Sequence, residues 1–472
     1  MYRFPIINKI ETTCISAALR GPKRSVIVEK TKKTFEKLFW LLLLASPALD
    51  LVNGIWSYVL CGGDGGMLSS LDIKGLPTLS PSFAVRMTML VLMVAYLFLQ
   101  KRWKPILMFV GIGITWVLSV GGEIIRGVPF SLGADIQYIT RFCYCLVVLI
   151  AYSTMLKQDK RGQTWLRESI DKVLSGSLLV LGMGVLVPYM LGMGFYTYAD
   201  RMGYRGSRGF FYAGNDITAV MMLMLPVVLV SWLEQKDVRK TGWAWAQALA
   251  SAMCLMSMLI IGTKTAFLAL AVTLLAMGCY GLFAGVREKD WRVIKRLAVV
   301  ILLVLLLLLL LLLVCENSPL ETIWKSFTVT QQLAEKEDLE TAVLSGRTTT
   351  LDAVVEQFKN GMPLTAVVGI GRGSQEKIIE MDLLEVVFYY GILGAVSMLW
   401  LYLLQGVKVI IDLFRAFSLR NLAVCVALGL CVGYLTLAGH TLFSVTAGFY
   451  FAFMIVYARL FCSKDGMDTK IL

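Results

Sequence analysis

The chain is 472 residues long, 57% of them hydrophobic and only 16% charged, and its mean hydropathy is +0.72. Soluble globular domains carry about 25% charged residues, so these values exclude an ordinary soluble enzyme. Apolar stretches of roughly 18 to 24 residues recur along nearly the whole length, and each can cross about 30 Å of hydrocarbon. We expect an all-α polytopic membrane protein, because a transmembrane barrel would show alternating segments of about ten residues instead.

Twelve membrane spans are predicted, and they divide the chain into five parts. The spans cover about 38–60, 83–100, 105–121, 134–156, 174–196, 215–233, 243–261, 264–285, 297–314, 383–405, 421–438 and 440–461. The parts are a basic N-terminal segment (1–37), spans one to nine (38–314), one large loop (315–382), spans ten to twelve (383–461) and a tail (462–472). The run 298–314 is mostly leucine and valine, which is typical of a helix that faces lipid.

The basic residues predict the orientation of the chain. Twelve spans place both termini on one side, and about two thirds of the 45 Lys and Arg residues lie in the segments of that side. The positive-inside rule makes this side cytoplasmic, so both termini are expected inside the cell and the large loop outside. The net charge of +13 then reflects topology, and no nucleic-acid partner is expected.

Within the large loop, the stretch "TTTLDAVVEQFKNG" predicts an amphipathic helix. Leu351, Val354, Val355 and Phe358 share one helical face, which starts after the threonine run and ends at Gly361. We expect this helix to lie on the membrane surface or against the spans, so that membrane lipids are among its partners.

Three arginines stand out in the loop 197–214, which contains "RMGYRGSRGFFYAGND". Arg201, Arg205 and Arg208 lie on the predicted outer side, where the positive-inside bias depletes arginine. A guanidinium offers two parallel hydrogen bonds to phosphate oxygens, so the cluster predicts a phosphate or pyrophosphate site. Contact with lipid head groups or with loop carboxylates is the alternative interpretation. Arg347, in "SGR", is a further outer arginine.

Three carboxylates lie at the start of the tenth span. Glu380, Asp382 and Glu385 either cap the helix and favour its dipole, or include a general base near the membrane surface. Glu385 lies one helical turn into the span, where a carboxylate is costly and by default suggests a function.

Further polar residues within or beside spans predict a polar cavity or internal ion pairs. They are Asp50 in the first span, Arg86 in the second, Arg141 in the fourth, Asn215 and Asp216 at the start of the sixth, Lys264 at the start of the eighth, and His440 at the start of the twelfth. His440 is the only histidine of the chain, which excludes a multi-histidine metal site. We expect neither a metal nor a cofactor.

With these residues in view, the chain resembles the O-antigen ligase and polymerase family of bacterial membrane glycosyltransferases, from about residue 38 to 460. The resemblance rests on the many spans with one large late loop and on three stretches in order: "RGFFYAGN", "GTKTAFLAL", and "VVGIGRG" leading to "YYGILGA". Family ligases carry a histidine motif at the end of the loop. Its two glycines align with Gly391 and Gly394, but Glu380 stands at its histidine position. This departure favours the polymerase-type members.

The resemblance implies a helical fold of the glycosyltransferase C type (GT-C) in the bacterial cytoplasmic membrane. It also implies a sugar donor linked to undecaprenyl diphosphate, used on the outer face, with a flippase and a chain-length regulator as working partners. Such an enzyme would hold the pyrophosphate with Arg201, Arg205, Arg208 or Arg347. The base would be one of Glu380, Asp382 and Glu385.

Three other functions remain open. A ligase would transfer the glycan to a different acceptor, a flippase would transport the lipid-linked sugar, and a peptidoglycan polymerase of the shape, elongation, division and sporulation family would share an outer acidic loop. A transporter is disfavoured because the polar residues gather on one side of the membrane and no two-half repeat is visible.

Overall fold

The computed structural model describes residues 22–60, 81–101, 103–198, 205–235, 242–336, 347–375 and 378–463. Eleven of the described helices are long and apolar enough to cross a membrane. They are α2 (Pro22–Leu60), α4 (Pro81–Leu99), α5 (Trp103–Arg126), α6 (Leu132–Lys157), α7 (Gln163–Met190), α8 (Gly214–Leu233), α9 (Gly242–Ile261), α10 (Lys264–Arg287), α11 (Arg292–Val314), α18 (Leu419–Leu437), and the run of α16 (Asp382–Gly394), η3 (Ala395–Leu399) and α17 (Trp400–Arg415). The last run is kinked at Gly391, whose backbone is not helical. The predicted all-α polytopic fold is confirmed.

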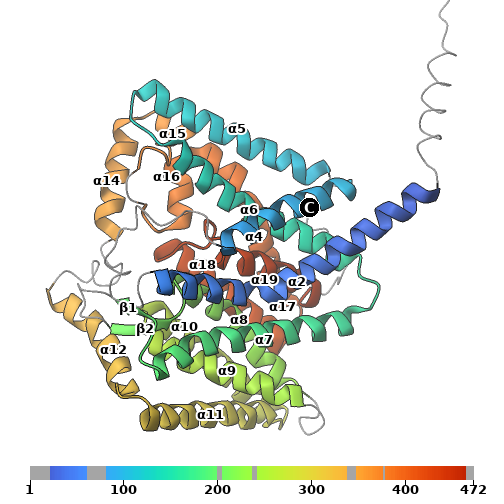
Figure 1. The fold of residues 1–472 in the computed structure, drawn as a ribbon, viewed down its shortest axis with the longest axis vertical. Helices are drawn as coiled ribbons and strands as arrows, with labels where there is room; N and C mark the ends of the chain where they lie inside the picture. The colour runs from blue at the N-terminus through green and yellow to red at the C-terminus, as the bar shows by residue number, and fades with distance from the viewer. Residues whose placement is uncertain are drawn as a thin grey trace, which may run out of the picture.

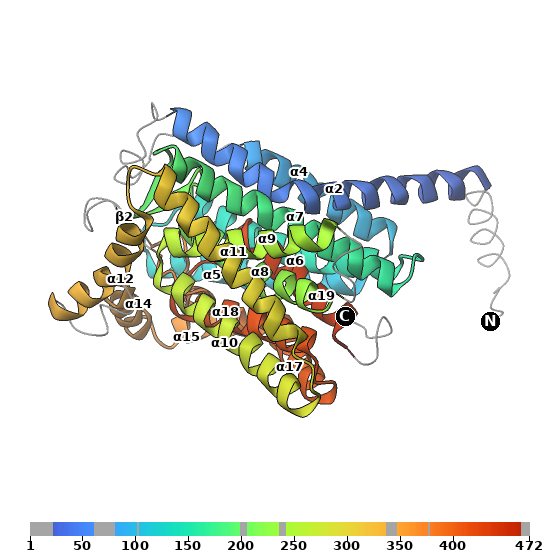
Figure 2. The ribbon, with the colours of Figure 1, turned by 90° about the horizontal axis from the view of Figure 1, so that it is seen from below.

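Most helices run side by side along one direction (Figures 1 and 2). At one end of the bundle lie a β-hairpin and the helices α12 (Pro319–Lys336), α14 (Arg347–Asn360) and α15 (Leu364–Val368). We call this the hairpin end. The N-terminal part of α2 projects from the opposite end. Helix α14 is the predicted amphipathic helix, although it begins at Arg347 and so includes the threonine run.

Helix α8 forms the centre of the bundle and α11 its edge. The most apolar part of α8 is 94% buried, because α8 packs against α9, α18 and α19 (Ala447–Phe461). The corresponding part of α11 is only 17% buried. Its leucines therefore lie on the surface, as expected of a helix that faces lipid.

The twelfth predicted span differs from the structure. Helix α19 has 15 residues, or about 22 Å, which is less than the roughly 30 Å of a hydrocarbon core. Residues 438–446 form an irregular segment, although 440–446 were expected to be helical, so the prediction that His440 begins a span was wrong. Thr441 and Leu442 donate their backbone N–H groups to the carboxylate of Asp382 at 2.6 Å each. This contact across 59 and 60 residues of sequence holds the backbone away from a helical path.

The hairpin was also missed by sequence reasoning. Strands β1 (Phe195–Tyr198) and β2 (Arg205–Gly209) pair antiparallel, where the end of a span and a loop were expected. Helix α7 ends at Met190, and Gly192 and Gly194 follow with φ of +65° and +98°. A Cβ at Gly194 would meet the carbonyl oxygen of Gly209 at 2.6 Å. Only glycine allows this left-handed turn and the close strand approach.

The opposite end of the bundle is held by buried ion pairs. Arg420 at the start of α18 pairs with Asp171 of α7 at 2.9 Å and with Glu234, the residue after α8, at 2.7 Å. Tyr457 of α19 donates a hydrogen bond to Asp171 at 2.7 Å. One guanidinium therefore ties the ends of four helices together.

Candidate functional site

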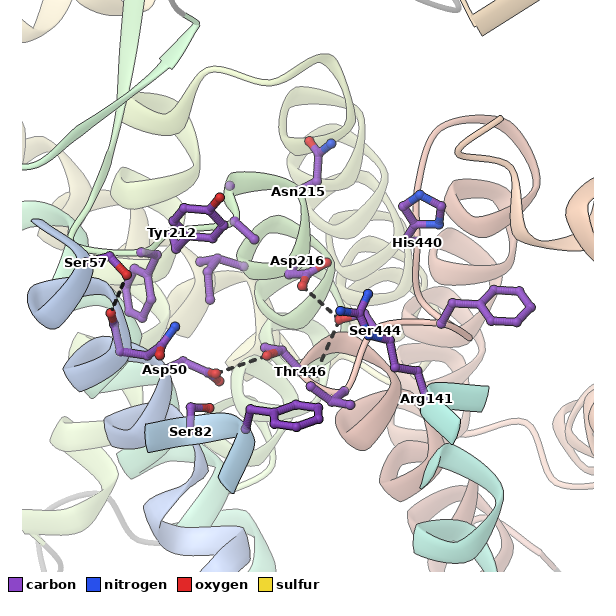
Figure 3. A pocket seen from close by; sticks show the side chains of 18 of the residues that line it. Asp50, Ser57, Ser82, Arg141, Tyr212, Asn215, Asp216, His440, Ser444 and Thr446 are labelled. Atoms are coloured by element: carbon purple, nitrogen blue, oxygen red, sulfur yellow. Dashed lines mark hydrogen bonds between the residues drawn. The ribbon is translucent and has the colours of Figure 1, made fainter. Parts of the chain in front are cut away.

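A cavity of about 790 Å³ opens at the hairpin end of the bundle. Its walls come from α2, α4, α6, the hairpin, the start of α8, the glycine-rich segment before α16, and the irregular segment 438–446. Figure 3 shows side chains of α2, α4, α6, the start of α8 and the segment 438–446 around one space. The cavity is the place where a substrate would meet most of the predicted polar residues.

An ion pair lies on the wall formed by α2 and α4. Arg86 contacts Asp50 at 2.8 Å and donates further hydrogen bonds to Ser82 at 2.8 Å and Thr446 at 2.9 Å. Arg86 is 1% exposed. Ser46 accepts a third hydrogen bond of this kind from the guanidinium at 3.3 Å. The nearby carboxylate neutralises the charge of the buried guanidinium, and the three hydroxyls accept its hydrogen bonds. The pair joins α2 and α4 to the segment before α19, and it adds little net charge to the cavity.

Three other arginines line the cavity without such a partner. Among the described residues, no carboxylate forms an ion pair with Arg141, Arg208 or Arg372. The Nε atoms of Arg208 and Arg372 are buried and have no hydrogen-bond partner there. Burial lowers the pKa of Arg208 to about 10, although Tyr212 opposes this shift. The guanidinium still carries its charge at neutral pH, so the cavity is suited to an anion.

The structure does not bring the four predicted outer arginines together. Arg208 lines the cavity, whereas Arg205 donates a hydrogen bond to the carbonyl of Lys325 at 3.3 Å, toward α12. Arg347 pairs with Glu380 at 2.7 Å, and neither of these two residues is among those lining the cavity. Arg201 lies outside the described residues.

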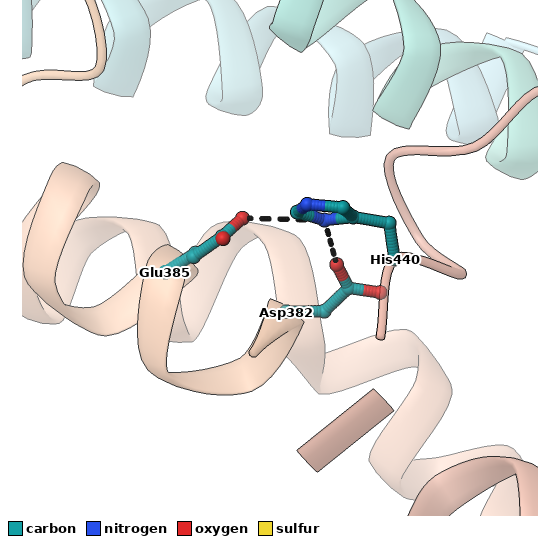
Figure 4. A group of neighbouring side chains, drawn as sticks. All are labelled: Asp382, Glu385 and His440. Atoms are coloured by element: carbon teal, nitrogen blue, oxygen red, sulfur yellow. Dashed lines mark hydrogen bonds and ion pairs between the residues drawn. The ribbon is translucent and has the colours of Figure 1, made fainter. Parts of the chain in front are cut away.

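The sole histidine lies beside two of the predicted carboxylates (Figure 4). His440 Nδ1 is 3.2 Å from Oδ1 of Asp382 and 3.7 Å from Oε2 of Glu385. Oε1 of Glu385 accepts the backbone N–H of Glu380 at 2.6 Å, and Oε2 accepts the hydroxyl of Tyr138. We call Asp382, Glu385 and His440 the histidine cluster. It joins the start of α16 to the segment before α19.

Only His440 of this cluster lines the cavity. Asp382 and Glu385 are fully buried behind it. Burial lowers the pKa of His440, but the hydrogen bond with Asp382 and the charges of Glu385 and Asp382 outweigh burial and raise the pKa to about 9. Nε2 of His440 is buried without a hydrogen-bond partner among the described residues. That nitrogen is the atom of the cluster left for a substrate.

By distance alone, the histidine cluster could hold a metal ion, since its ligand atoms lie within 4.8 Å of one another. Each of the four carboxylate oxygens already has a protein partner, however. Asp382 contacts two backbone N–H groups and the imidazole, and Glu385 accepts from a backbone N–H and a phenol. The hydrogen bonds that are present explain the cluster without an ion.

The remaining predicted residues divide between the cavity and other places. Asn215 and Asp216 line the cavity at the start of α8, where Asp216 accepts a hydrogen bond from Ser444 at 2.8 Å. Lys264 begins α10, as expected, and is not among the residues that line the cavity. The catalytic and binding roles of all these residues stay predictions.

Comparison with protein families identifies the chain. Residues 32–339 and 325–461 match the family described as O-antigen ligase like membrane protein. The chain belongs to this family. A search of curated proteins gave no match. Membership makes the chain an O-antigen ligase-like membrane protein and implies glycosyl transfer. All of the residues that line the cavity fall inside the two matched ranges.

Sequence reasoning missed two residues of the site in this O-antigen ligase-like protein. Tyr138 lines the cavity and donates to Glu385. Arg372 lines the cavity with its guanidinium 5.6 Å from the Tyr138 ring centroid. The stretch "GIGRGS" did carry a signal for Arg372, because an arginine between glycines often reaches a ligand from a tight turn. No sequence signal distinguishes Tyr138 from other tyrosines within spans.

Proposed function

We propose that this O-antigen ligase-like protein polymerises oligosaccharide repeat units linked to undecaprenyl diphosphate. The repeat units would be those of an O-antigen, capsular, exopolysaccharide or teichuronic-type polymer. The hairpin end would then face the outside of a bacterial cytoplasmic membrane, with both termini in the cytoplasm. One observation carries the proposal: three arginines without a carboxylate partner share a cavity with His440. A lipid diphosphate needs such cations, and a sugar hydroxyl needs a proton acceptor.

The arginines would act on the leaving group. As the bond between the sugar and the diphosphate breaks, negative charge grows on the departing pyrophosphate. Arg141, Arg208 and Arg372 already line the cavity before this charge develops, so their charges would stabilise it as it grows. Charge-assisted hydrogen bonds of this kind contribute about 1.5 to 3 kcal/mol each. Two of them would stabilise the leaving group by about 3 to 6 kcal/mol.

The histidine cluster would act on the acceptor hydroxyl. Positioned proton transfer contributes about 10² to 10⁴-fold to such reactions. Nε2 of His440 is the cluster atom available to the cavity, whereas both oxygens of Asp382 and of Glu385 are engaged. We therefore assign contact with the acceptor hydroxyl to His440, with Asp382 and Glu385 orienting the ring. Because the pKa of His440 is raised to about 9, only the deprotonated fraction of the ring accepts the proton, and transfer should become faster as the pH rises toward 9. Glu380, paired with Arg347, fixes the backbone N–H that holds Glu385.

A ligase is the second candidate. The family description itself names O-antigen ligation, and the same cavity would serve a donor whose glycan goes to a different acceptor. Both enzymes would work with a flippase that delivers the donor. A chain-length regulator would accompany the polymerase only.

Incubating the purified full-length protein in lipid nanodiscs with an undecaprenyl-diphosphate oligosaccharide tests these functions. A ladder of products differing by one repeat unit supports the polymerase. A single product that appears only with an added acceptor supports the ligase. Movement of the donor across vesicle membranes, with neither product, supports a flippase and refutes both. Arg205→Ala is the matched control, since it removes an arginine of the same strand that points away from the cavity.

A further inference from the structure

Two acidic residues lie buried beneath the glycine-rich segment that carries Arg372. Glu123 of α5 is 0% exposed, and Asp135 of α6 is 1% exposed. Their carboxyl groups lie against each other. Oε2 of Glu123 and both carboxyl oxygens of Asp135 are buried with no hydrogen-bond partner in the described part of the chain. The backbone N–H groups of Arg372 and Gly373 face Asp135 but lie outside hydrogen-bond geometry. Carboxyl oxygens without a hydrogen bond would be unstable there if both groups were ionised.

The segment 369–375 is built around these two acids. A Cβ at Gly371 would overlap the Glu123 carboxylate, and one at Gly373 would lie 2.5 Å from Oδ2 of Asp135. Gly371 has a φ of +77°, so glycine is needed there for conformation as well as for space. We call residues 369–375 the glycine loop.

Hydrogen bonds fasten the glycine loop to the helices that carry the acids. Ser374 donates its backbone N–H to Oε1 of Glu123 at 2.8 Å. Ser131, which caps α6, donates its own N–H to the carbonyl of Gly373 at 2.9 Å. Arg126 of α5 donates to the carbonyl of Ile370 at 2.5 Å. Both flanks of Arg372 are therefore anchored within two residues.

Arg372 itself has few contacts that would hold it. Its guanidinium donates to the carbonyl of Gln375 at 2.7 Å, within the same loop, and its Nε has no partner among the described residues. Its place in the cavity therefore depends on where the glycine loop lies. The titratable or charged groups around the acid pair are Arg126, Arg372 and the buried Tyr390 hydroxyl.

We propose that Glu123 and Asp135 are positioning residues that share one proton beneath the glycine loop and hold Arg372 at the cavity. A proton between the two carboxyl groups supplies the missing hydrogen bond and leaves one negative charge. That charge faces Arg372 and the N–H groups of the loop. The proposal rests on the proposed function only for the ligand of Arg372, a lipid-linked diphosphate.

Amide and alanine substitutions separate positioning with a shared proton from simple packing. In Glu123→Gln or Asp135→Asn, an amide N–H takes the place of the shared proton, so donor kcat/KM should stay within about threefold of wild type. Glu123→Ala removes the anchor of Ser374 and should lower it about 10- to 100-fold, as Arg372→Ala should, since each loses one charge-assisted hydrogen bond. Amide variants as weak as the alanine variant would refute the shared proton.

A double-variant cycle tests whether Glu123 acts through Arg372. The Glu123→Ala/Arg372→Ala protein should be no weaker than Arg372→Ala alone, because residues that act on one interaction are not additive. Losses that multiply in the double variant would refute the positioning role. If Glu123→Ala does not fold, Gly371→Ala can replace it in the test, because the added Cβ crowds the same carboxylate. Gly127→Ala is its control, since Gly127 also has a positive φ, +64°, but open space around it.

Hydrogen exchange gives a readout that does not require activity. Glu123→Ala should accelerate amide exchange in residues 369–375 of the full-length protein, whereas Gly127→Ala should not. Unchanged exchange in an active protein would overturn the positioning role and leave the proposed function standing. Faster exchange in a protein whose wild type makes no product would overturn the proposed function and leave the positioning role standing.

Discussion

His440 should make the stability of the protein depend on alkaline pH. Its pKa is raised from 6.5 to about 9 in the folded protein, so the folded state favours the imidazolium over the neutral ring. The resulting stabilisation is fully present below about pH 6.5, the unfolded value, and is lost as the pH rises through about 9. Replacing His440 by glutamine keeps a hydrogen-bond donor near Asp382 but removes the titration.

The size of this effect follows from the shift. A difference of about 2.5 pH units corresponds to about 3 kcal/mol at 1.36 kcal/mol per unit. The His440 side chain is 22% exposed and its partner Asp382 is fully buried, so solvent screens the interaction only in part. For a protein of this size, a loss of about 3 kcal/mol lowers the unfolding temperature by a few degrees.

Thermal unfolding in detergent, followed by intrinsic fluorescence between pH 6 and pH 10, measures this effect. Wild type should lose several degrees more than His440→Gln over that interval, with most of the difference appearing between pH 7.5 and pH 9.5. Subtracting the unfolding temperatures of the two proteins at each pH cancels the effect of every titratable group that both proteins contain. Parallel curves for the two proteins would contradict a histidine charge stabilised by Asp382 and Glu385.

Three further predictions concern orientation, the arginines and the opposite end of the bundle. A single cysteine introduced at position 340 should react with an impermeant reagent from outside intact cells and one at position 160 should not; the reverse pattern would overturn the orientation. Arg208→Lys keeps a charge but loses the planar pair of donors, so kcat/KM should fall about 10- to 100-fold, while Arg205→Lys stays near wild type. Normal turnover by both Arg208→Ala and Arg372→Ala would contradict the proposal that these arginines hold the pyrophosphate. Arg420→Ala leaves the buried Asp171 without its cation and should lower the free energy of unfolding by about 3 to 5 kcal/mol. An unchanged unfolding temperature would contradict this stabilising role of Arg420.

The sequence predicted the spanning helices well because hydropathy is a local property. Eleven helices follow from apolar runs of sufficient length. The twelfth run is equally apolar, but its first residues bind Asp382 instead of forming a helical turn. Asp382 is distant in sequence from this run, and no local sequence pattern predicts the contact.

The site was harder to predict because it depends on the direction in which side chains point. Arg205 and Arg208 looked equivalent in a loop. In strand β2 they are three residues apart, which places them on opposite faces, and only Arg208 reaches the cavity. Arg372 reaches it because two glycines fit over acids of two other helices. Such fits are visible only when the helices are in place.

The shortness of α19 has a consequence for the depth at which a substrate would be handled. A helix of about 22 Å leaves about 8 Å of the hydrocarbon thickness to the irregular segment before it. Non-helical backbone at that level is tolerated where it borders a polar space, and His440, Ser444 and Thr446 border this one. Under the proposed function, a diphosphate held there would sit below the plane of the lipid head groups. Bulk water would reach such a recess less readily than a bound sugar hydroxyl, so an enzyme of the proposed function would favour transfer over hydrolysis of the donor.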